Sequence, residues 1–89
     1  MTEQQEQDLA KFAATMRAKL LKRDSDEEKT GWSNEAPFYL LERLHQETAE
    51  LLEAFDKNDL QEIILECADV ANFAMMLASN VRRLQEMDL

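Results

Sequence analysis

Residues 63–78 read Ile-Ile-Leu-Glu-Cys-Ala-Asp-Val-Ala-Asn-Phe-Ala-Met-Met-Leu-Ala, and this stretch decides the fold. Its strongly polar members, Glu66, Asp69 and Asn72, recur at every third position, and every other residue is apolar or small. At about 100° per residue in a helix, these three side chains step round one arc of about 120°. A helix that is apolar nearly all round is buried nearly all round. We therefore expect a buried helix whose polar arc lies near a second packed surface.

A second helix is predicted immediately before this one, ending at about Phe55. Its core stripe consists of Leu40, Leu44, Leu51 and Phe55. Residues 56–59 have turn composition, and an aspartate at 59 followed by a glutamate at 62 resembles a capping box at the start of the next helix. The two helices are therefore predicted to form a tight antiparallel hairpin.

The start of the second helix is marked by Pro37, which fits the first helical turn. Ser33 or Asn34 offers the N-cap. The preceding segment, residues 24–34, is polar, holds the single glycine, Gly31, and is predicted to be a loop.

An N-terminal helix is predicted from apolar residues at helical spacing, and it is expected to end near Arg23. These residues are Leu9, Phe12, Ala13, Met16 and Leu20. Lys19, Lys22 and Arg23 then fall in its last turns, where cations favour the helix dipole. The predicted fold class is all-α: one domain over residues 1–89, built as a helical hairpin plus an N-terminal helix. A chain this short buries only about two-thirds of its unfolded surface, so we expect a homodimer or homotetramer with a core of the four-helix-bundle type.

Composition excludes several functional classes. The 89 residues carry 19 acidic and 10 basic side chains, a formal charge of −9, which disfavours nucleic-acid binding. No apolar run reaches the length of a membrane helix, so no membrane partner is expected. Cys67 is the only cysteine and the N-terminal residues are acidic and polar, so we expect a cytoplasmic protein.

The acidity is concentrated on the predicted hairpin. Residues 42–69 hold nine acidic and two basic side chains. Glu47 and Glu50 lie about 60° apart on the second helix, and the hairpin can bring them level with Glu66 and Asp69. Buried carboxylates need a cation, a donor network or a proton. Four carboxylates suit a hard cation such as Mg²⁺ or Mn²⁺, although a tertiary contact with arginine is the alternative.

The pattern of these carboxylates resembles the MazG-like, all-α nucleoside triphosphate pyrophosphohydrolases, which include the dimeric dUTPases. Their mark is E-x-x-E on one helix and E-x-x-D on the next, here Glu47-Thr48-Ala49-Glu50 and Glu66-Cys67-Ala68-Asp69. The likeness covers residues 32–81. It implies Mg²⁺-dependent hydrolysis of a nucleoside triphosphate between the α and β phosphates, giving a monophosphate and pyrophosphate, in housekeeping of the nucleotide pool.

The resemblance also implies roles for individual residues. Glu47, Glu50, Glu66 and Asp69 would be catalytic metal ligands, and Glu53 would bind a second metal ion, orient the attacking water or simply be a solvated carboxylate. Three further residues are candidates for substrate contacts: Asn72, Arg43 and Trp32. For Arg43 an ion pair with Glu47, and for Trp32 a place sealing the core, are equally good interpretations.

Two other functions remain open from the sequence. Glu42-Arg43-Leu44-His45 matches the E-x-x-H unit of di-iron or di-manganese carboxylate bundles. A non-catalytic acidic helical interaction protein is the third possibility, and it predicts acids spread over the exposed surface rather than within an apolar stretch.

Overall fold

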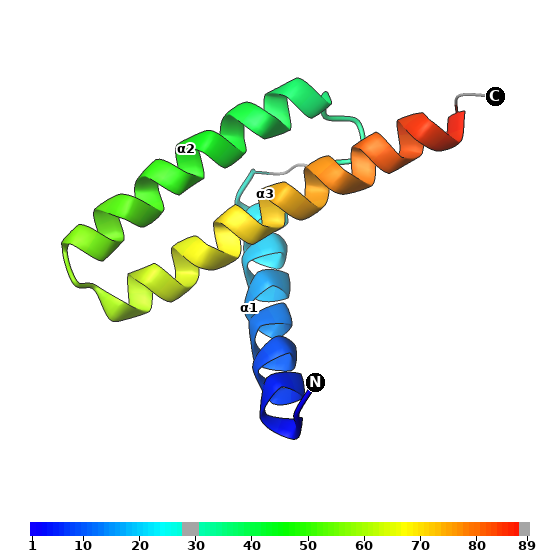
Figure 1. Cartoon of the computed structure of the whole chain (residues 1–89). Helices are drawn as coiled ribbons and strands as arrows, with labels where there is room; N and C mark the ends of the chain where they lie inside the picture. The colour runs from blue at the N-terminus through cyan, green and yellow to red at the C-terminus, as the bar shows by residue number, and fades with distance from the viewer. Residues whose placement is uncertain (28–30, 88–89) are drawn as a thin grey trace.

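The computed structural model describes residues 1–27 and 31–87, which form three helices and contain no strand. These are α1 (Glu3–Glu27), α2 (Pro37–Asp56) and α3 (Leu60–Met87). Helices α2 and α3 run antiparallel as a hairpin, and α1 crosses the middle of α3 and projects away from it (Figure 1). The predicted all-α class and the hairpin are confirmed.

Helix α1 is longer than expected. It continues to Glu27, so its predicted end near Arg23 was wrong, as was the start of the loop at residue 24. Lys19, Lys22 and Arg23 therefore do not lie in the last turn. Lys19 pairs with Asp69 on α3, and the guanidinium of Arg23 lies over the ring of Phe73. Residues 28–30 of the predicted loop lie outside the described residues.

The N-terminus of α2 lacks the predicted side-chain cap. Its N-cap is Ala36, which makes no side-chain hydrogen bond, so the expectation of Ser33 or Asn34 was wrong. Pro37 takes the first helical position, as predicted, where its missing N–H costs no intrahelical hydrogen bond. The loop is held instead by α3, because Nδ2 of Asn80 donates to the carbonyl oxygens of Trp32 (2.9 Å) and Glu35 (2.8 Å).

The hairpin turn follows its sequence signals. The backbone N–H of Glu62 donates to Oδ1 of Asp59 at 3.1 Å, which confirms the aspartate as the cap of α3. Asn58 has φ +54°, the left-handed conformation that asparagine tolerates better than most residues. The turn therefore fixes the height at which residues of α2 meet those of α3.

The core lies between the helices and is small. Leu40, Phe73 and Met76 form its buried centre, with Trp32 and Leu20 among the side chains packed against it. The polar arc of α3 faces this interior, whereas the apolar arc on its other side is half-buried or exposed, as at Val81 (48% exposed). Carboxylates that point into the interior must be stabilised by a cation, by hydrogen-bond donors or by a proton.

One apolar face of the hairpin stays open to solvent in the single chain. Phe55 is 66% exposed and Leu52 is 64% exposed, so the predicted placement of Phe55 in a core does not hold within one chain. The radius of gyration is 14.6 Å, against about 12 Å for a compact domain of this length. No four-helix bundle is closed by the described residues. Nor does any described helix combine the length and apolarity needed to span a bilayer.

Candidate metal centre

Three carboxylates from the two hairpin helices converge at one point. Glu47 comes from α2, and Glu66 and Asp69 come from α3. Each offers an oxygen that lies within 4.8 Å of the other two. Glu47 is 5% exposed and Glu66 is 9% exposed. We call these three residues the carboxylate cluster.

Two oxygens of the carboxylate cluster have no protein partner. Oε2 of Glu47 and Oε2 of Glu66 are buried and accept no hydrogen bond. Leaving a buried acceptor unsatisfied costs about 1–3 kcal/mol, and more when the group is charged. Because these atoms belong to adjacent carboxylates, one cation between them would satisfy both.

The electrostatics of the cluster show the same deficit of positive charge. Burial, reinforced by Glu50, raises the pKa of Glu47 to about 7. Burial, reinforced by Glu62 and by Asp69, raises the pKa of Glu66 to about 8. Burial also raises the pKa of Asp69, although Lys19 opposes the shift. The protein charges alone do not stabilise three ionised carboxylates at this spacing.

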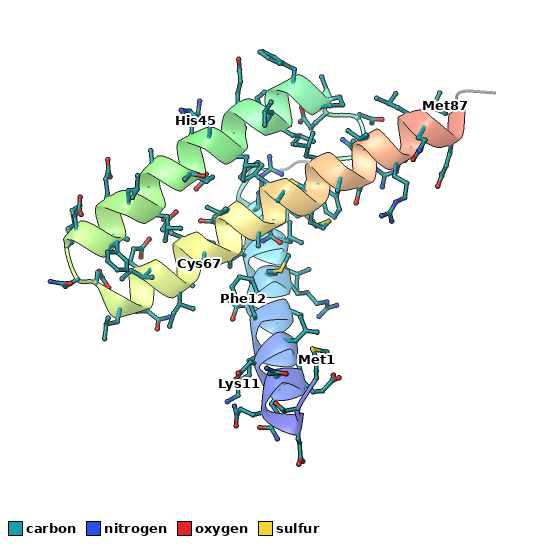
Figure 2. The ribbon with its side chains drawn as sticks, viewed as in Figure 1. Met1, Lys11, Phe12, His45, Cys67 and Met87 are labelled. Carbon is teal, nitrogen blue, oxygen red and sulfur yellow. The ribbon has the colours of Figure 1, made fainter. Side chains whose placement is uncertain are left out.

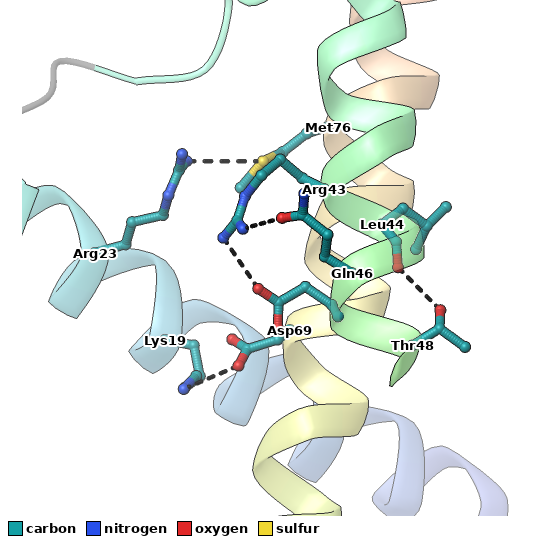
Figure 3. Close-up of polar contacts among 9 residues, drawn as sticks. Lys19, Arg23, Arg43, Leu44, Gln46, Thr48, Asp69 and Met76 are labelled. Atoms are coloured by element: carbon teal, nitrogen blue, oxygen red, sulfur yellow. Dashed lines mark hydrogen bonds and ion pairs between the residues drawn. The ribbon is translucent and has the colours of Figure 1, made fainter. Parts of the chain in front are cut away.

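Two basic side chains partly compensate the cluster through ion pairs. Nζ of Lys19, on α1, lies 3.2 Å from Oδ2 of Asp69. Nη2 of Arg43, one turn before Glu47 on α2, donates to Oε1 of Glu47 at 3.1 Å (Figure 3). The sequence allowed two interpretations of Arg43, a substrate contact or an ion pair with Glu47, and the structure contains the ion pair. The lysine contact cannot be predicted from the sequence, because no local pattern indicates that Lys19 of α1 meets Asp69 of α3, fifty positions later.

Glu50 and Glu53 border the cluster without joining it. Both are exposed on α2. Both line a pocket of about 470 Å³, and one residue of the carboxylate cluster, Glu66, lines it too. Glu50 is near enough to raise the pKa of all three cluster carboxylates. Of the four carboxylates predicted from the sequence, three therefore converge, and the fourth, Glu50, lies beside them.

The residues predicted to contact substrate lie in two different places. Asn72 is 3% exposed, its Nδ2 donates to the carbonyl oxygen of Met16 at 3.0 Å, and its Oδ1 is buried without a partner. Trp32 packs against the core, and its buried Nε1 has no acceptor. Arg43 and Asn72 line one pocket with Glu47 and Asp69, whereas Trp32 is not part of that lining.

The two residues that suggested a di-iron bundle lie elsewhere. Glu42 and His45 are both exposed on α2. His45 projects from the side of α2 that faces away from α3 (Figure 2). Among the described residues, the possible metal-binding group contains carboxylates only.

Comparison with known proteins agrees with this geometry. Residues 9–83 match the family described as phosphoribosyl-ATP pyrophosphohydrolase, which is most of the chain and includes the whole carboxylate cluster. The chain belongs to the phosphoribosyl-ATP pyrophosphohydrolase family. This family is part of the MazG-like superfamily of nucleoside triphosphate pyrophosphohydrolases, so the resemblance seen in the sequence is confirmed.

Members of the phosphoribosyl-ATP pyrophosphohydrolase family are pyrophosphohydrolases and typically depend on Mg²⁺. An uncharacterized protein of Archaeoglobus fulgidus is 42% identical over 69 residues, which are 75% of this chain and 74% of the relative. No solved structure matches the chain.

Proposed function

We propose that this protein is a divalent-metal-dependent pyrophosphohydrolase that cleaves a nucleoside triphosphate-like substrate between its α and β phosphates. The observation that carries the proposal is the carboxylate cluster, with its two buried and unpartnered oxygens, in a chain of this family. Such a reaction would keep the nucleotide pool in balance by turning triphosphates into monophosphates.

The donor set fits Mg²⁺ or Mn²⁺. Both ions prefer carboxylate and water oxygens to imidazole or thiolate. Glu47, Glu66 and Asp69 would hold the ion, and Glu50, which borders the cluster, would complete the set. When bound, a divalent cation neutralises phosphate charge, polarises the phosphorus and makes a water molecule more acidic.

Two further side chains, Glu53 and Asn72, are assigned roles in the proposed hydrolysis. Water attacks the α phosphorus, the bond from that phosphorus to the bridging oxygen breaks, and pyrophosphate leaves with the bonding electron pair. Glu53, exposed at the edge of the acidic pocket, is our candidate for taking the water proton. Asn72 offers a fixed acceptor for a substrate hydroxyl, because its amide nitrogen is already held by α1.

The reaction is tested by identifying the products. The purified protein is incubated with Mg²⁺ and a panel of ribonucleoside and deoxyribonucleoside triphosphates, together with phosphoribosyl-ATP, and the products are separated. We expect a monophosphate and pyrophosphate from at least one substrate, and none when the metal is chelated. Diphosphate and free phosphate as products, or no turnover of any substrate, would overturn the proposal.

We also propose that a second copy of the chain covers the open apolar face of the hairpin, giving a homodimer or homotetramer. The face includes an apolar pocket of about 470 Å³ that both helices line, with Leu52, Phe55 and Ile63 among its residues. Contiguous apolar surface of this kind is rare on soluble monomers. Covering it would also bury the apolar side of α3, which the single chain leaves half-exposed.

Leu52→Glu is expected to dissociate this assembly. Leucine at 52 is 64% exposed in the single chain, so the change costs little in a monomer, whereas an interface loses an apolar anchor. Loss of a central anchor costs 2 kcal/mol or more, so the subunit dissociation constant should rise at least about 30-fold. Size-exclusion chromatography with light scattering measures this, with Asn34→Asp, an added charge in an exposed loop, as the control. A wild-type protein that is monomeric at tens of micromolar would contradict the proposal.

A further inference from the structure

The carboxylate cluster lies between two pockets of opposite charge. On one side is the acidic pocket already described, which is lined by Glu50, Glu53, Ala54, Lys57, Asp59, Glu62 and Glu66. On the other side, between α1 and the hairpin, is a cationic pocket of about 200 Å³. Its lining includes four basic side chains, Lys19, Lys22, Arg23 and Arg43, and only two acidic ones, Glu47 and Asp69. In a chain of charge −9, a pocket with a basic majority is a local exception.

Two of these basic side chains hold cluster carboxylates, and Figure 3 labels both members of one pair, Lys19 and Asp69. Lys19 pairs with Asp69, and Arg43 pairs with Glu47. The side chain of Lys19 is 28% exposed and that of Arg43 is 32% exposed, so both reach solvent. A divalent cation at the cluster would compete directly with both ion pairs.

A second feature of the cationic pocket indicates that it takes a ligand. Asn72, 3% exposed, lines the pocket and has a buried carboxamide oxygen without a partner. Its amide nitrogen is fixed by the carbonyl of Met16, so the side chain cannot turn to satisfy the oxygen elsewhere without losing that bond. The pocket thus offers cationic donors beside an unsatisfied acceptor, which suits a phosphorylated ligand that also carries hydroxyl groups.

We propose that Lys19 and Arg43 are exchange residues. Without metal they neutralise Asp69 and Glu47, and when a divalent cation holds the cluster they are released to bind the substrate phosphates in the cationic pocket. The flexible lysine supplies a mobile point charge, and the arginine supplies a planar fork that matches phosphate oxygens. The inference rests on the proposed function for the identity of the ligand, and it places the phosphates on the α1 side of the cluster.

The exchange predicts opposite effects of one substitution on two ligands. Lys19→Met removes the competing cation and keeps a side chain of similar length. Mn²⁺ alone should bind this variant about fivefold more tightly than wild type, a change equivalent to losing one ion pair. Inorganic tripolyphosphate, added as its Mn²⁺ complex to metal-saturated protein, should bind at least about tenfold more weakly, because a charge-assisted hydrogen bond is lost. Calorimetric titration measures both affinities.

Two further variants make the test decisive. Lys11→Met, on an exposed position of the same helix, should change neither affinity. Arg43→Gln, on α2, should have the same two effects as Lys19→Met: tighter Mn²⁺ binding and weaker tripolyphosphate binding. Circular dichroism checks that each variant keeps its helical content. Unchanged Mn²⁺ affinity in both Lys19→Met and Arg43→Gln would overturn the exchange, and unchanged tripolyphosphate affinity in both would overturn their role toward phosphate.

The same titrations separate this inference from the proposed function. Wild-type protein that binds Mn²⁺ and tripolyphosphate with the predicted variant effects, yet hydrolyses no nucleoside triphosphate, would overturn the function and leave the exchange standing. Wild-type protein that binds no Mn²⁺ would overturn both.

Discussion

Glu66→Gln is expected to abolish turnover while making the metal-free protein more resistant to heat at alkaline pH. The glutamine keeps the size of Glu66 but cannot carry the charge that a cation needs. Altering groups that merely orient metal ligands costs 10–100-fold in metal affinity or activity, so loss of a ligand should lower kcat/KM at least about 100-fold. Removing a carboxylate whose pKa is raised to about 8 also relieves repulsion in the cluster. The melting temperature of the metal-free protein should therefore rise at pH 9, rise less at pH 6, and change little near pH 4.5, where Glu66 is largely neutral in the folded state and costs little to protonate.

The matched control is Glu86→Gln, which changes an exposed glutamate on the same helix, well away from the cluster. It should leave both activity and melting temperature close to wild type. Circular dichroism at 222 nm should show the same helicity in both variants. Full activity in Glu66→Gln would place the metal site elsewhere, and a lower melting temperature at pH 9 would contradict the electrostatic description of the cluster.

The second large effect is the pH dependence of stability. The ordinary pKa of a glutamate is 4.5, and in the folded protein the pKa of Glu47 rises to about 7 and that of Glu66 to about 8. Between pH 4.5 and 8 the folded state therefore binds more protons than the unfolded state. By linkage, the free energy of unfolding of the metal-free protein falls as the pH rises through this range.

Divalent metal should reverse this loss. A change of 1 kcal/mol moves the melting temperature of a domain of this size by about 4–8 °C, so metal-free protein should melt at least about 5 °C lower at pH 8.5 than at pH 6. Saturating Mg²⁺ should restore most of the difference at pH 8.5 and add little at pH 6, because the ion competes with protons for the same oxygens. Differential scanning fluorimetry with and without chelator measures this. A melting temperature that rises with pH in the metal-free protein would refute the assignment.

Local signals in the sequence were enough to predict the hairpin. The apolar run of α3, the turn composition before it and the Asp59 cap are short-range features, and each has a direct counterpart in the structure. The carboxylate cluster followed from them, because a tight turn fixes which turns of α2 and α3 stand side by side. The sequence predicts Glu47, Glu50, Glu66 and Asp69 as one group, and three of these four converge in the structure.

Features that depend on tertiary contacts were not predictable in the same way. The side chain that holds the loop before α2 is Asn80, more than forty residues further along, so local capping rules at Ser33 and Asn34 gave the wrong N-cap. Lys19 had a sufficient local explanation at the end of a helix. Only the crossing of α1 over α3 reveals its ion pair with Asp69.

The orientation of α3 is the most informative departure from ordinary helix patterns. An amphipathic helix turns its apolar stripe inward, yet α3 turns Glu66 and Asn72 inward and leaves Val81 exposed. The two proposals above account for this orientation: the inner side of α3 would supply the metal ligands, and the outer side would pack against a second copy of the chain. Helical periodicity defines both arcs of α3 but does not indicate which of them faces the interior.

Anomalous X-ray scattering from crystals soaked in Mn²⁺ tests the central claim most directly. The account predicts a Mn²⁺ peak between α2 and α3, within about 2–2.5 Å of carboxylate oxygens from Glu47, Glu66 and Asp69. In the same crystals of Glu66→Gln, that peak should disappear or lose most of its height. Ordered Mn²⁺ bound only at other acidic side chains, or a cluster that stays without a peak at saturating metal, would contradict the account.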